Sequence, residues 1–182
     1  MKQALLIGSI ILIPAGFLAA GGPDSRDGSV VPASVSGTFD GAASSQRDLV
    51  DALLRALQRK DEHALRRLRV TEAEYRDVII PGTVPPGQPP RSLTAAWKDY
   101  AWANLNDRST AYERLLIAEY GGQDLTVEEV GFEDGEQRYA GYTAYRQLRL
   151  KLRNADGVER ELRTGSVVEV AGKYKFISFI RD

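Results

Sequence analysis

The chain contains no cysteine and only one histidine among its 182 residues. Without cysteine, no disulfide, thiol nucleophile, iron–sulfur cluster or cysteine-ligated zinc site can form. A single imidazole also excludes every site that needs two histidines. Most metal and catalytic-triad chemistry is therefore excluded, and we expect neither a metal nor a cofactor.

The chain also lacks an excess of charge of either sign. Its 24 basic and 25 acidic residues give a formal net charge of −1 and a pI near 6.0. A protein that owes its affinity to phosphate neutralisation needs a basic surplus, so we expect no nucleic acid partner. Hydrophobic residues make up 43% of the chain, which is enough for a core, and the length suits one domain.

The one long apolar run lies at the start of the chain. Residues 4–20 follow Lys2 and lead into small residues, a layout typical of a secretory signal peptide. The run contains glycine and proline and falls short of the ~20 residues of a comfortable membrane span. We predict a signal peptide over residues 1–22, cleaved near Ala20 to Gly22, and export to the periplasm or the medium. Only an uncleaved leader would hold the chain at a membrane.

The next segment, residues 23–44, consists mostly of Gly, Ser, Ala, Pro and Asp. This composition predicts a flexible linker. In the alternative, the segment is an extended arm that packs Val30 and Val31 or Phe39 on the domain. The folded domain is expected over residues 45–182.

Capping residues and apolar spacing predict helices in the first half of the domain. Ser45 caps a helix over residues 48–59, whose inward face carries leucine at positions 49, 53 and 57. Asp61 caps a second short helix. Residues 71–74 form a capping box that starts a third helix, which Pro81 ends.

A proline-rich segment then separates these helices from a longer one. Residues 81–90 contain five prolines, which remove backbone donors, so we expect a surface loop or a lid. Ser92 is expected to cap a long helix that reaches Tyr120 and ends at the glycine pair 121–122. The polar stretch 104–107 could kink this helix.

Beyond residue 122 the apolar pattern changes to a period of two, which indicates strands. Turn residues stand at 134–135, 154–157 and 171–172. Alternation is clearest over residues 148–153, where leucine and a cationic residue take turns. In a strand, this pattern places the leucines on one face and the cations on the other. Helices followed by strands with short links predict an α+β domain with helices on one face of an antiparallel sheet.

This order of elements resembles the nuclear transport factor 2-like superfamily of cystatin-like α+β proteins. The resemblance is carried by the opening helix 48–59, the Lys-Asp-Glu-His-Ala-Leu step at 60–65 and the closing strand 172–179 with its Gly-Lys-Tyr-Lys start. It implies a cone-shaped fold in which a curved sheet and helices enclose a mostly apolar pocket. The segments 71–81 and 120–122 are also similar to those of uncharacterised exported bacterial proteins.

Enzymes of this superfamily, such as ketosteroid isomerase, scytalone dehydratase and polyketide cyclases, place Asp, Tyr or His in that pocket. The first helix here has only leucine on its inward face, which disfavours an isomerase. His63 lies in a polar first turn beside Asp61 and Glu62, so we expect a solvated side chain rather than a catalytic base. No residue is assigned a catalytic role.

Aromatic and polar residues recur along the long helix at spacings of three or four. These ligand-pocket candidates are Trp97, Tyr100, Asn104, Arg108 and Tyr112. On one helix face they could line a pocket and orient a ligand carboxylate or carbonyl. Ordinary core packing is the alternative.

Charge is distributed unevenly along the strand region. Residues 119–136 hold seven acids and no base, whereas residues 146–181 hold nine bases and four acids. Neighbouring strands could neutralise each other. Alternatively, the cations form a docking surface for a protein, for anionic lipid headgroups or for a second copy of the chain. The partner-surface candidates are Arg149, Lys151, Arg153 and Arg163, on a face through which domains of the superfamily commonly form homodimers.

Together these patterns predict an exported, non-catalytic binding or interaction module with a small apolar ligand or a protein partner. The alternative is a small-molecule enzyme of the polyketide cyclase or dehydratase type that uses Tyr112 and Glu119. A third reading is a structural helper whose sheet pairs with another protein.

Overall fold

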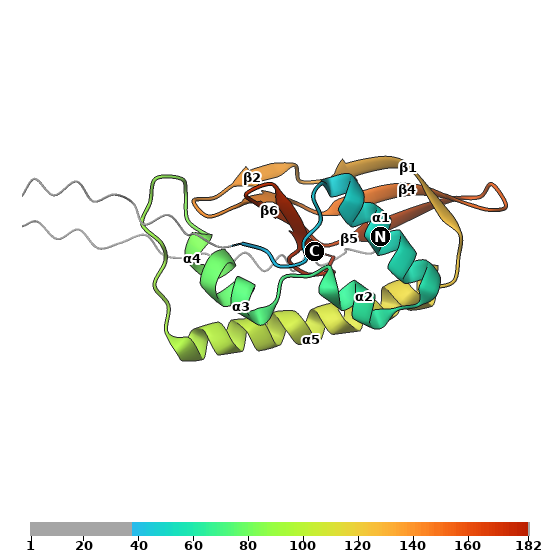
Figure 1. Cartoon of the computed structure of the whole chain (residues 1–182). Helices are drawn as coiled ribbons and strands as arrows, with labels where there is room; N and C mark the ends of the chain where they lie inside the picture. Colours follow the sequence, from blue (N-terminus) through green and yellow to red (C-terminus); the bar gives the residue numbers. More distant parts are fainter. Residues whose placement is uncertain (1–37, 182) are drawn as a thin grey trace, which may run out of the picture. The chain divides into compact units, whose positions relative to one another are not determined.

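The helices come first in the chain and the strands follow, as Figure 1 shows. A computed structural model describes residues 38–181. The predicted signal peptide and residues 23–37 of the predicted linker lie outside the described residues. The helices are α1 (Gln46–Arg59), α2 (Glu62–Arg67), α3 (Glu72–Glu74), the π-helical η1 (Tyr75–Ile79), α4 (Ile80–Gly82) and α5 (Ala95–Tyr120). The strands are β1 (Leu125–Phe132), β2 (Glu136–Arg138), β3 (Thr143–Tyr145), β4 (Leu148–Asn154), β5 (Glu159–Thr164), β6 (Val167–Val170) and β7 (Lys173–Phe176).

The predicted caps of the first three helices are confirmed. The Ser45 hydroxyl accepts a hydrogen bond from the Asp48 N–H at 3.0 Å, and Asp61 caps α2 in the same way. Thr71 and Glu74 form the complete capping box. Because proline fits the first turn of a helix, Pro81 does not end the helical segment as predicted; α4 continues to Gly82.

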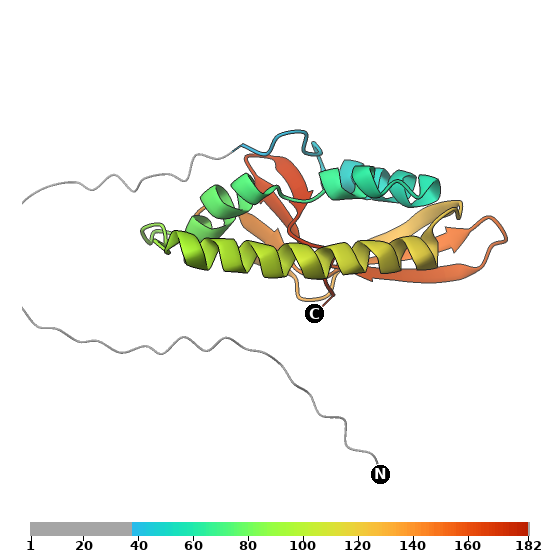
Figure 2. The ribbon, with the colours of Figure 1, turned by 90° about the horizontal axis from the view of Figure 1, so that it is seen from below.

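The long helix α5 differs from the prediction at its start. Thr94, rather than Ser92, is the N-cap, and its hydroxyl accepts a hydrogen bond from the Trp97 N–H at 3.3 Å. The helix continues without interruption through residues 104–107 and ends at Tyr120, as predicted. In Figure 2 it lies as one straight helix across the strands. A loop precedes it, as the prolines predict.

The strands form two antiparallel sheets, of order β1-β4-β5 and β2-β3-β6-β7. Three extended stretches of the chain each contribute one strand to each sheet: β1 leads into β2, β3 into β4, and β5 into β6. All three leave one sheet for the other near the same level, at residues 133–135, 146–147 and 165–166. Gly165 is needed there, because a Cβ atom at this position would lie 2.3 Å from the Ser178 carbonyl oxygen.

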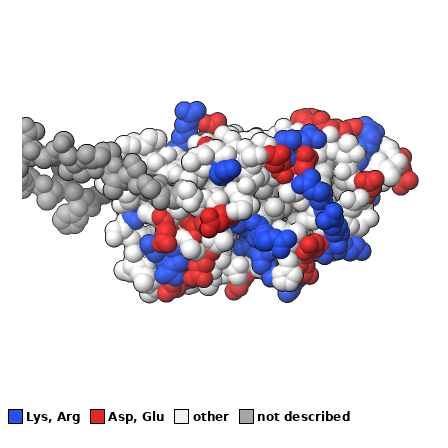
Figure 3. Space-filling view, in the orientation of Figure 1, with Lys and Arg blue, Asp and Glu red and all other residues white. Residues whose placement is uncertain are grey.

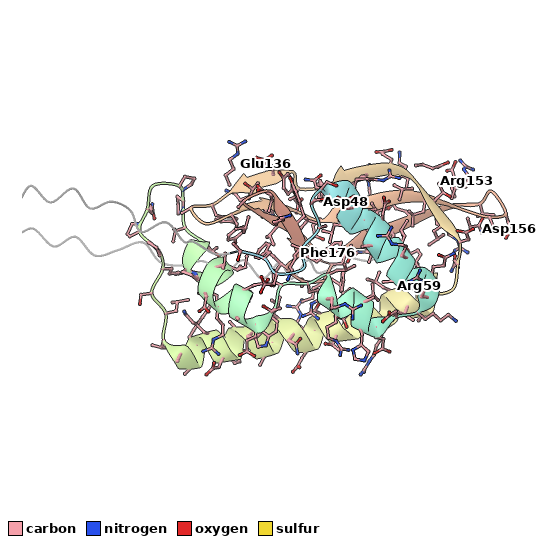
Figure 4. All side chains as sticks on the ribbon, in the orientation of Figure 1. Asp48, Arg59, Glu136, Arg153, Asp156 and Phe176 are labelled. Atoms are coloured by element: carbon pink, nitrogen blue, oxygen red, sulfur yellow. The ribbon has the colours of Figure 1, made fainter. Side chains whose placement is uncertain are left out.

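The main core lies between the helices and the strands. It contains the leucines of α1, Leu116 and Tyr120 of α5, and the leucines of β4. The predicted inward faces of α1 and β4 are therefore confirmed. Phe176, labelled in Figure 4, lies in this cluster. The observed architecture is therefore α+β with antiparallel strands, as the sequence predicts, but the strands form two sheets where one was expected.

A second cluster gathers around Phe39, with Val70, Val78, Tyr142 and Val168 among its members. Phe39 lies in the segment predicted to be a linker, so residues 39–44 belong to the folded unit. This agrees with the alternative in which Phe39 packs as part of an arm. Backbone hydrogen bonds between Ala43 and Tyr174 fix this arm along the edge of β7.

Candidate ligand-binding cleft

The ligand-pocket candidates on α5 do not converge on a pocket. Trp97 and Tyr100 are 46% and 71% exposed, and Asn104 and Arg108 are also exposed. These four residues are therefore outside the cleft described below. Tyr112 is half-buried, and its hydroxyl lies 3.5 Å from the carbonyl oxygen of Arg181.

The inward face of α5 carries polar side chains, which explains this placement. Asn106, Ser109 and Glu113 face the core side. The Ser109 hydroxyl accepts a hydrogen bond from the Phe179 N–H at 2.9 Å, so its burial satisfies a backbone donor. Because burial on this helix does not follow apolarity, an apolar stripe could not locate the inward face.

The partner-surface candidates are exposed or half-buried, and each is paired. The pairs are Arg149 and Lys151 with Glu129, Arg153 with Glu128 at 2.5 Å, and Arg163 with Glu133 at 3.1 Å. All three glutamates belong to the acidic segment 119–136, and Figure 3 shows the two signs interleaved over β1 and β4. Mutual neutralisation of neighbouring strands is confirmed, and these residues do not form a surface of unpaired cations.

A cleft of about 760 Å³ lies between α1, α2, α5 and the segment that follows α2. Its basic side chains are Arg55, Arg59, Arg66, Arg67, Arg69 and Lys175, its acidic ones are Asp40 and Asp61, and its one histidine is His63. Its apolar side chains are Ala52, Ala56, Ala64, Leu68 and Trp102; Val70 also lines it, but its side chain lies in the second core. Figure 3 shows Lys and Arg side chains gathered over α1 and α2, and Figure 4 labels Arg59 at the end of α1.

Arg69 is the most buried cation of the cleft, with 2% of its side chain exposed. The backbone of residues 68–70 pairs with Phe176 on β7 through two hydrogen bonds of 2.8 Å, which directs successive side chains to opposite sides. Val70 therefore enters the second core and Arg69 faces the helices. Its Nη1 donates to Glu113 Oε1 at 2.5 Å, and its Nη2 to Asn106 at 3.3 Å.

This buried pair leaves two polar atoms without hydrogen bonds among the described residues. They are Arg69 Nε and Glu113 Oε2. Glu113, 1% exposed, has a second cation at 3.5 Å, the Arg66 Nε, which balances charge without a hydrogen bond. Buried polar atoms are almost always satisfied, so the unpaired Nε–H of this cleft residue is an exception to the general pattern.

A second buried ion pair holds the edge of the cleft. Lys175 Nζ lies 2.8 Å and 2.9 Å from the two carboxylate oxygens of Glu74. The same carboxylate accepts hydrogen bonds from the Thr71 and Asp40 N–H groups, at 2.7 Å and 3.0 Å. The ammonium also lies over the Phe39 ring. One carboxylate thus joins the N-terminal arm, α3 and β7.

Three cations of the cleft have no such partner. Arg55, Arg59 and Arg67 form no hydrogen bond or ion pair with any residue between 38 and 181, and all three are exposed. Of the three, Arg55 lies in the electrostatic field of the Asp48 carboxylate. His63 is also exposed, as predicted. The Asp61 carboxylate is engaged as the cap of α2, where it accepts from the Ala64 N–H at 2.8 Å.

The sequence does contain a signal for this cleft. Residues 55–69 hold six Lys or Arg residues and two acids, a local surplus that the balanced total charge conceals. The helix break at residues 60–61 brings the two halves of this segment onto neighbouring helices, which concentrates the charge. The buried partners Glu113 and Lys175 have no local signal, because they lie far away in the sequence.

The two residues that the alternative enzyme would use lie in one hollow. Tyr112 and Glu119 line a depression of about 390 Å³ with Tyr120, Glu161 and Arg163. Burial and the neighbouring Glu119 carboxylate raise the pKa of Tyr120 to about 12. Its hydroxyl donates to the Glu161 carbonyl at 2.6 Å. Tyr120 therefore stays protonated at neutral pH.

Comparison of the chain with protein-family models, curated proteins and solved structures gives no significant match. No helix between residues 38 and 181 is both long and apolar enough to cross a membrane. Within the same residues, no group of three or more His, Asp or Glu side chains is placed to hold a metal ion.

Proposed function

We propose that the chain is an exported ligand-binding module with a nuclear transport factor 2-like, cone-shaped fold, and that the cleft between α1, α2 and α5 holds its ligand. The cleft itself is the observation that carries this proposal. Its volume of about 760 Å³ lies in the range of small-molecule sites. Its wall combines apolar side chains with polar ones, of which Arg69 and Lys175 are held in place by buried ion pairs.

The fold proposal is supported by the order of the elements. Helices precede strands, and three long antiparallel stretches pass from one sheet to the other at the same level. A change of direction at this level would curve the strand layer around the helices, as a cone requires. Export is supported by the leader-like pattern of residues 1–22 alone.

The chemistry of the cleft supports binding rather than catalysis. Five side chains of the cleft carry guanidinium groups, which keep their protons throughout the physiological pH range, so they orient and neutralise ligands but do not exchange protons with them. His63 also lines the cleft, but its side chain is exposed and no described carboxylate orients it, as the base of an enzyme would require. In the other hollow, Glu119 is exposed, whereas the alternative enzyme requires a carboxylate inside an apolar cavity.

A thermal-shift experiment with a small-molecule library tests the proposal. Ala52 is a partly exposed residue that lines the cleft, and Ala52→Trp fills the cleft with a bulky ring. Ala118→Trp places the same ring on the exposed side of α5 as a control. We expect compounds that raise the Tm of the wild type and of Ala118→Trp but not of Ala52→Trp. The proposal is wrong if no compound raises the Tm, or if all three proteins respond equally.

The predicted homodimer is a separate proposal. The outer faces of β1, β4 and β5 carry ion pairs that neutralise each other, so a second copy would meet a polar but balanced surface. Native mass spectrometry of the purified chain gives the number of subunits. A dimer that dissociates in Lys151→Glu would support the sheet face as the interface, whereas a monomer at micromolar concentration would exclude it.

A further inference from the structure

We infer that the ligand of this cleft is a small amphipathic organic molecule with an oxyanionic group, bound by Arg59, Arg67 and the Nε–H of Arg69. This inference rests on the proposed function and specifies the chemistry of the same site. It follows from the unpaired donors of the cleft and from the apolar residues beside them.

The two exposed arginines supply charge without a partner in the described part of the chain. Arg59 lies at the end of α1 and Arg67 at the end of α2, and both line the cleft. Their planar guanidinium groups match the geometry of a carboxylate or a phosphate. Arg66, Lys175 and Asp61 differ, because they are engaged by Glu113, Glu74 and the α2 backbone. Arg55 also lines the cleft without an ion pair, but it lies in the field of the Asp48 carboxylate.

The third donor is the Nε–H of Arg69, and the two hydrogen-bond partners of this side chain fix its orientation. Glu113 and Asn106 hold the two terminal nitrogens of Arg69, so the guanidinium plane is fixed and the direction of the Nε–H bond is fixed with it. Arg69 lines the cleft, whereas its Nε–H is itself buried and has no acceptor among the described residues. An anionic oxygen at this point would satisfy a buried donor that otherwise costs free energy.

The remaining wall is apolar and suits the body of an organic ligand. Ala52, Ala56 and Leu68 line it beside the arginines. Trp102 lines it from α5, and its ring is held against Tyr75 at a centroid distance of 5.7 Å. A ring or short alkyl group can therefore lie on Trp102 while its oxyanion reaches the guanidinium groups.

Matched aromatic probes test this inference on the full chain. Phenyl phosphate, benzoate, benzyl alcohol and benzylamine share one ring and differ in charge. We expect phenyl phosphate to bind about tenfold or more tightly than benzyl alcohol, benzoate to lie between them, and benzylamine not to bind. Isothermal titration measures the affinities. Added salt should weaken binding of both anions, because their attraction to the exposed arginines is screened.

Two variants and one spectroscopic signal locate the anion. Arg59→Gln and Arg67→Gln should each weaken phenyl phosphate binding several-fold, whereas Arg108→Gln, at an exposed arginine outside the cleft, should leave it unchanged. In ¹H–¹⁵N spectra, the Nε–H signal of Arg69 should shift when phenyl phosphate is added. If Arg69 only stabilises the fold, its Nε–H signal should not shift when phenyl phosphate is added.

The outcomes separate this inference from the proposed function. If benzyl alcohol binds in the cleft as tightly as phenyl phosphate, the cleft holds ligands, but the inference that they carry an oxyanionic group is wrong. If the anions bind but Arg108→Gln weakens them as much as Arg59→Gln does, the assigned site is wrong. If no probe perturbs residues of the cleft, both the inference and the proposed function fail.

Discussion

Arg69 and Glu113 place opposite charges side by side in the interior, on segments that are 44 residues apart in the chain. Removing both charges from water costs several kcal/mol, and their mutual attraction and hydrogen bonds offset that cost only while both are present. The pair also positions Arg69 for the cleft.

Loss of one member of this pair should destabilise the protein strongly. We expect Glu113→Leu to lower the free energy of unfolding by about 3–5 kcal/mol, because it leaves Arg69 buried without a counter-charge. The double variant Arg69→Met with Glu113→Leu should recover much of that loss. Urea unfolding measures both. Equal losses in the single and the double variant would show that the charges do not interact.

Two buried tyrosines should make the protein sensitive to alkali. Burial raises the pKa of Tyr120 to about 12, and burial also raises the pKa of Tyr142, whose hydroxyl lies 3.0 Å from that of Thr83. Tyrosines of the unfolded chain ionise near pH 10. Above pH 10 the unfolded state therefore holds fewer protons than the folded state, and the free energy of unfolding falls as the pH rises toward 12.

The matching measurement is urea unfolding between pH 9 and pH 12. We expect the combined Tyr120→Phe and Tyr142→Phe variant to lose stability less steeply over this range than the wild type. Tyr100→Phe alters an exposed tyrosine and should keep the steep decline. A wild-type stability that stays constant through pH 11 would contradict the assignment.

Single residues of the cleft were only partly predictable. The cluster of cations at residues 55–69 is visible in the sequence. Which of them is buried is not, because the burial of Arg69 depends on its backbone pairing with β7 and on Glu113 of α5. His63 was predictable as solvated, since its neighbours are polar and its helix is short.

At the scale of elements, local chemistry predicted most boundaries. Caps and turns depend on residues within four positions of each other, so Ser45, Asp61 and Thr71 could be identified from the sequence. The cap of α5 was misplaced by two residues, because Ser92 and Thr94 carry equivalent hydroxyls. The inward face of α5 was missed, because its buried residues include Ser109 and Glu113.

Gly165 lies where the chain passes from β5 in one sheet to β6 in the other, and this position should not accept a side chain. At Gly165 a Cβ atom would lie 2.3 Å from one carbonyl oxygen and 2.9 Å from another. We expect Gly165→Ala to destabilise the protein by about 1–3 kcal/mol or more, since backbone must move to admit the methyl group. Gly131 is a strand glycine whose Cβ would meet its nearest atom at 4.0 Å. Gly131→Ala should therefore be nearly neutral in thermal unfolding, and equal effects would contradict this account of the turn.

At the scale of the whole molecule, the α+β class was predictable because helical and strand periodicities occupy separate halves of the sequence. The cleft was not, because its walls come from segments that meet only in the fold. Glu74 and Lys175, which close one edge, are 101 residues apart. Phe39 and Asp40 reach the same edge from a segment with a linker-like composition.

The most direct test of the central claim is a map of amide chemical-shift changes for the full chain titrated with a compound that raises its Tm. We predict that the shifts cluster on the parts of α1, α2 and α5 that line the cleft, around Ala52, Arg67 and Asn106. We also predict that they disappear in Ala52→Trp. Shifts confined to the outer face of β4 and β5, or to the hollow of Tyr112 and Glu119, would contradict the claim.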